Sequence, residues 1–131
     1  MSQENLDKAR EFIEAYNRRD FGAAFAWCDP EVDFILPARQ SSDSCRGTEE
    51  IRRFWQGIDE TFEEFQIEQR EFVDEGDRVA TRFQYHGRSK IGVELETELF
   101  HQVATFSEGR MVRIEYFGSW EEAQEALGTP E

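Results

Sequence analysis

The chain has 131 residues, of which 38% are hydrophobic and 34% charged, and this predicts one folded domain over residues 1–131. The net charge of −14 is spread evenly, because residues 1–65 hold 8 basic and 15 acidic side chains and residues 66–131 hold 7 and 14. Nucleic acids and anionic membranes both require clustered Lys and Arg, so the sequence excludes them as expected partners.

Two helices are predicted at the start of the chain. Ser2 is a suitable N-cap for a helix whose apolar residues recur every three or four positions as far as Tyr16. Asp20 is expected to cap a short second helix that continues to Trp27. The dipeptide Asp29-Pro30 then ends it, since the residue before proline is disfavoured in a helix.

A strand, a loop and a third helix follow. Apolar and polar residues alternate over 31–36, which predicts a short strand, and the Ser-rich segment 37–47 is expected to be a loop. Thr48 is the expected cap of a helix with an apolar stripe at 51, 54, 55, 58 and 62.

In the second half of the chain apolar residues recur at every second position, which predicts an antiparallel meander of strands. A capping box at Ser119 opens a last helix that ends at Gly128. Helices precede strands rather than alternating with them, so the fold class is α+β. The expected strands are 65–74, 78–86, a long and bent or bulged strand 93–106, and 111–118.

The sequence also indicates a compartment. Cys28 and Cys45 form no CxxC motif, the first residues are polar, and no apolar run approaches the length of a membrane span. We expect a soluble cytoplasmic protein. His86 and His101 lie 15 residues apart without carboxylates at ligand spacing, so neither a metal nor a cofactor is predicted.

Five local strings, taken in order, resemble the SnoaL-like and ketosteroid isomerase-like branch of the nuclear transport factor 2-like superfamily. The resemblance implies a cone-shaped, curved antiparallel sheet wrapped around N-terminal helices in the order αα-β-α-ββββ-α. It also implies an apolar pocket inside the cone and a dimer interface on the convex face. The strings occupy residues 16–20, 46–55, 83–88, 105–110 and 115–123.

The three catalytic positions of the ketosteroid isomerases are changed in this chain. The resemblance places Phe12 at the tyrosine, Phe34 at the proton-transferring aspartate and Gln102 at the hydrogen-bonding aspartate. Phenylalanine neither donates nor accepts a proton, so isomerase chemistry by that mechanism is not expected.

Strand parity predicts which side chains face the interior of the cone. The resulting wall is mostly aromatic with a few polar tips, which suits a flat, apolar ligand. The same aromatic residues would also suit a filled core. The predicted ligand-binding residues are Phe83, Phe100, Gln102, Ile114 and Tyr116 on the strands after residue 65, with Phe12, Tyr16, Phe34 and Trp55 facing them.

Two carboxylates are candidate proton carriers. Glu98 shares its parity with Gln102 and is a candidate general base at the pocket mouth, although a solvated strand face is the more ordinary interpretation. Asp33 is the second candidate, but strict alternation turns it away from the interior.

An apolar row on the opposite face predicts a homodimer, since such a row is too hydrophobic to be left in water. Its members are Leu95, Leu99, Val103, Met111 and Phe117.

Three functions remain open from the sequence. The first is a cofactor-free isomerase, cyclase or hydrolase acting on an apolar carbonyl or polycyclic compound. The second is a non-catalytic carrier of an apolar ligand in the same cone, and the third is a protein-interaction domain with a filled cone. A carboxylate or histidine in an open cavity would favour the enzyme, whereas aromatics and Gln102 alone would favour the carrier.

Overall fold

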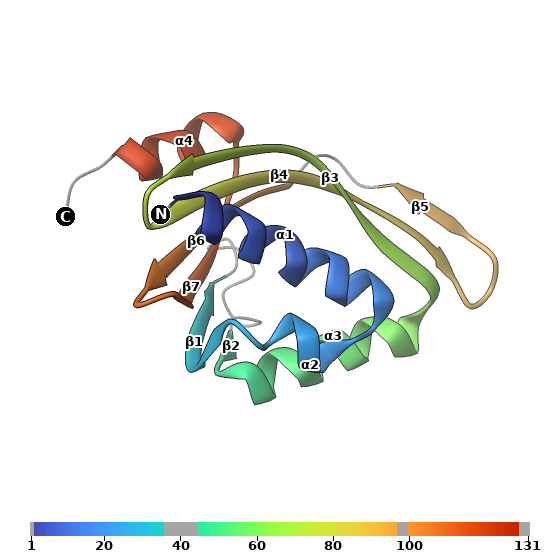
Figure 1. The fold of residues 1–131 in the computed structure, drawn as a ribbon. Coiled ribbons are helices and arrows are strands. Elements are labelled where there is room, and N and C mark those ends of the chain that lie inside the picture. Colours follow the sequence, from blue (N-terminus) through green and yellow to red (C-terminus); the bar gives the residue numbers. More distant parts are fainter. Residues whose placement is uncertain (1, 36–44, 97–99, 129–131) are drawn as a thin grey trace.

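A computed structural model describes residues 2–35, 45–96 and 100–128. The first half holds three helices, with two strands between the second and the third, strands fill most of the second half, and one helix closes the chain (Figure 1), so the predicted α+β class is confirmed. The elements are α1 (Ser2–Arg18), α2 (Phe21–Ala24), β1 (Cys28–Ile35), β2 (Cys45–Arg46), α3 (Thr48–Thr61), β3 (Phe62–Glu75), β4 (Arg78–Ser89), β5 (Glu94–Glu96), β6 (Phe100–Ser107), β7 (Arg110–Phe117) and α4 (Trp120–Gly128).

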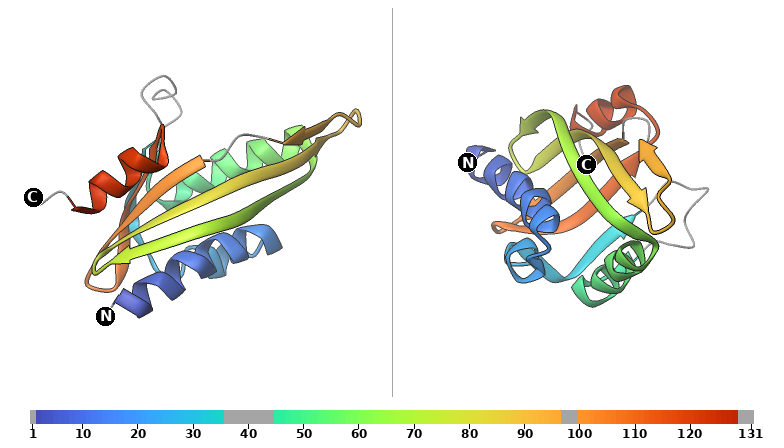
Figure 2. Two further views of the ribbon diagram at one scale, coloured as in Figure 1. Left: turned by 90° about the horizontal axis from the view of Figure 1, so that it is seen from above. Right: turned by 90° about the vertical axis from the view of Figure 1, so that its right-hand side faces the viewer.

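One curved, unclosed sheet organises the molecule. Its strand order is β2-β1-β7-β6-β4-β3, and β5 pairs with β4 outside this path. Strands β3, β4, β6 and β7 form the predicted antiparallel meander, while β1 joins β7 in parallel. Helices α1 to α3 lie on the concave side and α4 lies on the outer side (Figures 1 and 2).

The helix starts follow local hydrogen bonding. The Asp20 side chain accepts a bond from the Ala23 N–H at 3.1 Å, which confirms it as the cap of α2. Thr48 is not the cap of α3, because Gly47 takes that place at φ 90° and the Glu50 carboxylate accepts from the Arg46 N–H at 2.8 Å. A Cβ on Gly47 would lie 3.0 Å from the Pro30 carbonyl oxygen, so a side chain has no room there.

The strand boundaries differ from the predicted ones at two places. Strand β1 begins at Cys28, because this segment already lies beside β7, with Cys28 opposite Met111. The expected long strand 93–106 is represented by β5 and β6, and residues 97–99 between them lie outside the described part. Strand β2 is only two residues long, too short for periodicity to reveal.

The apolar row that predicted a dimer does not form an exposed patch within the described residues. Met111 is 1% exposed and belongs to the main core, because the pairing of β6 with β7 shifts register between Thr105 and Phe106. Val103 is 4% exposed and packs beneath α4, and Phe117 is half-buried against the same cluster. The side chains of Leu95 and Leu99 lie outside the described part.

Helix α4 is capped as the sequence predicts. The Glu122 N–H donates to the Ser119 hydroxyl at 3.1 Å, and the Glu122 carboxylate accepts from the Gly118 N–H at 3.1 Å. The helix covers Ala80 and Val103 on the outer face of the sheet, using Trp120 and Ala123. Within the described ranges, no helix combines the length and apolar character that a membrane span requires.

His101 lies under α4 and is 8% exposed. Its ring centroid is 6.1 Å from that of Trp120, and its ring hydrogen-bonds the backbone of Phe117. Burial, aided by the Arg82 charge, lowers the pKa of His101 below 6.5, although the Phe117 bond and Glu122 oppose this. Arg82 is itself bonded to Glu71 at 2.9 Å.

We therefore expect acid to weaken the docking of α4. The unfolded chain binds a proton at His101 more readily than the folded chain, so its contribution is complete above pH 6.5 and is lost as the pH falls through the lower folded pKa. Urea unfolding at pH 5.0 to 7.5 should show that His101→Gln reduces the pH dependence relative to wild type. A constant difference between the two proteins over this range would contradict the expectation.

Candidate functional site

The concave side of the sheet and helices α1 and α3 enclose a small aromatic cavity. It offers about 20 Å³ to the centre of a water-sized sphere, which is room for one water molecule. The described side chains therefore leave little open space within this cavity. The lining residues are Phe12, Ile13, Tyr16, Phe34, Phe54, Trp55, Ile58, Phe65, Ile67, Phe83, Tyr85, Gln102 and Tyr116.

Trp55 is the centre of the aromatic packing on the helical side. The indole is 6% exposed, and its centroid lies 4.6 Å from that of Tyr16 and 5.5 Å from that of Phe12. Phe21 and Phe25 of the α2 segment contact it at 5.3 and 5.1 Å. Trp55 is thus the side chain through which α1, the α2 segment and α3 are packed together.

Three polar side chains on neighbouring strands meet on the sheet side. Gln102 is 4% exposed and donates from Nε2 to the Tyr116 hydroxyl oxygen at 3.2 Å. Tyr85 also hydrogen-bonds Tyr116, and this bond raises the pKa of Tyr85 and lowers that of Tyr116, as expected if Tyr85 donates. Burial outweighs these bonds and raises the pKa of Tyr116. The Tyr116 oxygen accepts from Gln102, and a further hydrogen bond joins the two phenols.

Tyr16 supplies a second phenol on the opposite wall. The residue is 1% exposed, and its hydroxyl has no hydrogen-bond partner among the described residues. Burial raises the pKa of Tyr16 well above 10, so the group is a neutral donor at physiological pH. An unmet buried hydroxyl costs about 1–3 kcal/mol, and a ligand oxygen in the cavity would relieve that cost.

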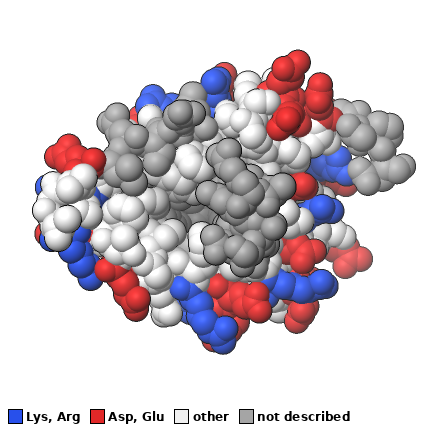
Figure 3. All heavy atoms as spheres, turned by 180° about the vertical axis from the view of Figure 1, so that it is seen from behind, with Lys and Arg blue, Asp and Glu red and all other residues white. Residues whose placement is uncertain are grey.

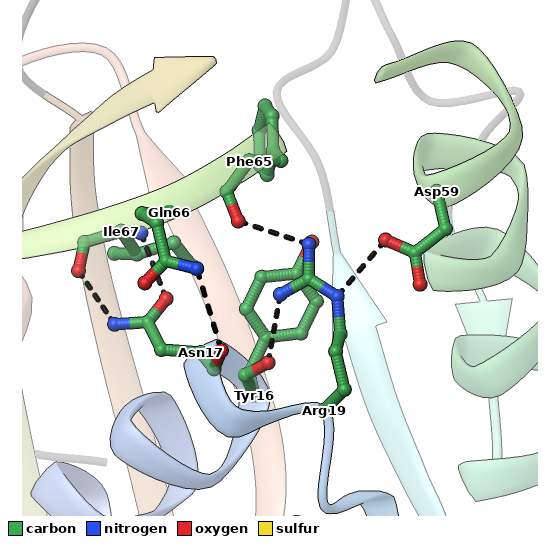
Figure 4. A network of polar contacts seen from close by, with 7 residues as sticks. All are labelled: Tyr16, Asn17, Arg19, Asp59, Phe65, Gln66 and Ile67. Atoms are coloured by element: carbon green, nitrogen blue, oxygen red, sulfur yellow. Dashed lines mark hydrogen bonds and ion pairs between the residues drawn. The ribbon is translucent and has the colours of Figure 1, made fainter. Parts of the chain in front are cut away.

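Polar contacts at the end of α1 determine where Tyr16 lies (Figure 4). The Asn17 side chain donates to the Ile67 carbonyl at 2.9 Å and accepts from the Ile67 N–H at 2.8 Å, so it pairs with β3 as a strand would. Arg19 bonds Asp59 of α3 at 3.0 Å and the Phe65 carbonyl of β3 at 2.9 Å. These contacts join α1, α3 and β3 around the cavity.

Seven of the nine predicted ligand-binding residues line the cavity. They are Phe12, Tyr16, Phe34, Trp55, Phe83, Gln102 and Tyr116. Phe100 stacks on Phe83 at 6.3 Å and Ile114 is fully buried in the core, and neither is among the residues that line this cavity. Their binding roles remain a prediction.

Six lining residues were missed by the parity argument. Phe54 and Ile58 lie on the predicted apolar stripe of α3, and Tyr85 shares the parity of Phe83, so signals for these three were present. The alternation at the start of β3 is too irregular to place Phe65 and Ile67. Ile13 follows Phe12 on the core side of α1.

The two candidate proton carriers do not add an acid to the described wall. Asp33 points away from the cavity, its side chain is 42% exposed, and it forms an ion pair with Arg46 at 3.8 Å. Glu98 lies outside the described residues. No three His, Cys, Asp or Glu side chains gather as metal ligands in the described part of the chain.

Charged side chains of both signs lie around the edge of the described part of the face in Figure 3, and uncharged ones lie between them. No large area of a single sign stands out on that face. This agrees with the even spread of charge along the sequence.

Comparisons with known proteins agree on one family. Residues 9–117 match the family model described as SnoaL-like domain. Three solved structures cover nearly the whole chain, each with a TM-score of 0.77: TerC co-crystallised with polyporic acid (18% identity, 96% of this chain, 99% of that one), an NTF2-like protein of unknown function from Burkholderia pseudomallei (23%, 96%, 98%), and a protein from Jannaschia sp. described as a SnoaL-like polyketide cyclase (16%, 99%, 95%). At these identities they show the fold alone. A search of curated proteins gives no match.

Proposed function

Since the chain belongs to the SnoaL-like domain family, we propose that it binds a small apolar molecule in the aromatic cavity and holds it by one acceptor oxygen. The observation that carries the proposal is that Tyr16 lines the cavity and that its buried hydroxyl has no partner among the described residues. The co-crystallisation of TerC with polyporic acid supports small-molecule binding in this fold.

The polar groups of the cavity define the chemistry of the ligand. Tyr16 has a proton to donate, Tyr116 supplies a second phenol, and no charged side chain lines the cavity among the described residues. A carbonyl, ether or phenolic oxygen on an apolar ring suits such a site, since one oxygen can accept from both phenols.

The proposed binding requires the space between the described lining residues to expand. A benzene-sized ligand occupies a cavity of about 150 Å³, several times the space present here. The half-buried lining residues Phe54, Ile58, Ile67 and Tyr85 lie on α3, β3 and β4. We propose that the ligand enters on this side, where side chains can move without unpacking the core.

The donor half of an acid–base catalyst is present, but the described lining residues include no carboxylate or imidazole to accept a proton. This favours binding over isomerase, cyclase or hydrolase chemistry. Phe12, Phe34 and Gln102, which stand at the catalytic positions of the ketosteroid isomerases by resemblance, all line the cavity. Two phenylalanines and an amide provide no base there.

The test compares 1-indanone with indane, because the two differ by a single carbonyl oxygen. We expect the wild-type protein to bind indanone more tightly, as measured by NMR chemical-shift titration. Gln102→Leu removes a bond that polarises Tyr116, so indanone binding should weaken about 5- to 150-fold, equivalent to about 1–3 kcal/mol.

Indane affinity is the internal control for this substitution. It should change little in Gln102→Leu, because indane has no oxygen to lose a partner. Equal wild-type affinities for the two compounds would contradict oxygen recognition, and binding of neither compound would contradict the choice of a bicyclic ligand.

A homodimer through the outer face of the sheet remains a prediction. An open groove beside α4 is lined by Thr105, Arg113, Glu115 and Phe117, and Arg113 and Glu115 pair at 3.4 Å. We expect light scattering to give about 31 kDa, twice the 15.4 kDa of one chain. Arg113→Glu would place additional acid on this face and should give the monomer. A wild-type mass near 15 kDa would contradict the prediction.

A further inference from the structure

Arg19 has an unfavourable backbone conformation. Its φ is 61°, in the left-handed region, and among the described residues Glu108 is the only other one besides glycines with a positive φ. This region is strained for residues with a Cβ, and glycine or asparagine is the usual occupant. Such strain persists where the surrounding contacts require it. The contacts of the Arg19 side chain are therefore expected to hold the backbone in this conformation.

The Arg19 guanidinium is held on three sides (Figure 4). Nε donates to Asp59 at 3.0 Å, Nη1 to the Tyr16 carbonyl at 2.9 Å and Nη2 to the Phe65 carbonyl at 2.9 Å. In this position the central carbon lies 4.5 Å from the centroid of the Tyr16 ring. One face of the ring is thus covered by a fixed cation, and Tyr16 is also one of the residues that line the cavity.

We propose that Arg19 is a positioning residue for Tyr16, and that together with Asp59 it sets the direction and the donor strength of the Tyr16 hydroxyl in the cavity. This inference rests on the proposed role of Tyr16 in holding a ligand oxygen. It adds that the strength of the contact is controlled from outside the cavity by an ion pair.

The physical basis is the effect of nearby charge on a phenol. A cation near the ring favours the ionised form and strengthens the O–H as a donor, whereas an anion weakens it. Arg19 acts to lower the pKa of Tyr16 and Asp59 acts to raise it, while burial has the largest effect and raises it. Tyr116 also acts to raise the pKa of Tyr16, and Tyr16 in turn acts to raise that of Tyr85.

A purely structural role for Arg19 predicts a different pattern. If the residue only ties α1 to α3 and β3, then loss of either partner of the ion pair loosens the same contact. Arg19 and Asp59 variants should in that case affect Tyr16 in the same direction. An electrostatic role predicts opposite directions.

The experiment uses the full chain with 3,5-difluorotyrosine in place of its three tyrosines. The fluorinated phenol is more acidic than tyrosine, so its titration is moved to lower pH. Fluorine NMR follows each phenol separately, and Tyr16→Phe identifies the resonance of Tyr16. The variants are Asp59→Asn, which keeps an oxygen for Arg19, and Arg19→Met. Arg18→Gln is the matched control, because Arg18 pairs with Glu11 on the exposed side of α1.

We expect Asp59→Asn to lower the pKa of the Tyr16 phenol and Arg19→Met to raise it, each by about 0.5 or more. Arg18→Gln should leave it unchanged. Shifts in the same direction for the first two variants, or shifts no larger than in the control, would overturn the proposal. If Arg19→Met does not fold, Arg19→Gly takes its place, because glycine accepts the left-handed backbone and removes the same charge.

The titration is performed without ligand. A failure of indanone binding would therefore refute the proposed function and leave this result intact. If the titration does not show the expected pKa shifts, the result of the indanone-binding assay is unaffected.

Discussion

Trp55→Ala should lower the free energy of unfolding by about 3–5 kcal/mol, the range for removing a large aromatic side chain from a core. The indole is 6% exposed and contacts four other rings, contributed by α1 and the α2 segment. Domains of this size are stable by about 5–15 kcal/mol, so the variant should retain only part of that stability. Urea unfolding followed by circular dichroism measures the loss.

Trp27→Ala is the matched control for this substitution. Trp27 is 45% exposed, and the structure places Lys8 over its ring at 4.5 Å, a contact worth about 0.5–1 kcal/mol at an exposed site. A loss in Trp55→Ala no greater than in Trp27→Ala would contradict the central role assigned to Trp55. Should Trp55→Ala fail to fold, Trp55→Phe should show a smaller loss of the same sign.

The space left by Trp55 should also accept a molecule of the same shape. Millimolar indole is expected to raise the melting temperature of Trp55→Ala, because an apolar space of this kind binds small aromatic molecules and ligand binding stabilises the folded state. Wild type and Trp27→Ala should not respond. An equal response in all three proteins would indicate non-specific binding.

Tyr16→Phe should stabilise the ligand-free protein by about 1–3 kcal/mol, since it removes a buried hydroxyl that has no partner among the described residues. The same change should weaken 1-indanone binding by a similar amount, because the donor is lost. A substitution that raises the stability of the protein and lowers its ligand affinity indicates that the replaced group serves binding. Urea unfolding and the NMR titration measure the two quantities on one sample.

Tyr85→Phe makes the same chemical change with the opposite expectation. The Tyr85 hydroxyl bonds Tyr116, so its removal should destabilise the protein by about 1 kcal/mol. Loss of stability in both variants would show that Tyr16 has a partner of its own in solution, and would remove the main support for the proposed ligand contact.

The helices and strands could be predicted because each buries one face, and this leaves a regular pattern of apolar residues in the sequence. The alternation in β4, β6 and β7 placed Phe83, Gln102 and Tyr116 on one face, and the structure brings them to one cavity. Parity failed at Met111, where the register shift between Thr105 and Phe106 moves the side chain from the outer face into the core. The residue types in that segment do not indicate such a shift in register.

The size of the cavity and the network around Tyr16 could not be predicted for a different reason. Asn17 meets Ile67, and Arg19 meets Asp59 and Phe65, across 40 to 50 positions of sequence. Local patterns carry no information on such pairs. The resemblance of residues 16–20 to a family string marked the place without indicating its contacts. Likewise, thirteen described side chains decide how much of this cavity is left empty, and this depends on rotamers rather than on residue types.

The parallel pairing of β1 with β7 has a consequence for the order of events during synthesis. Cys28 lies opposite Met111, so β1 emerges from the ribosome 83 residues before the strand that it joins. At about 5–20 residues per second, this interval is about 4 to 17 s. During that time some of the strands that bury β1 and the apolar faces of α1 and α3 have not yet been synthesised. We expect chaperones, or temporary contacts among the aromatic rings of these segments, to prevent their aggregation.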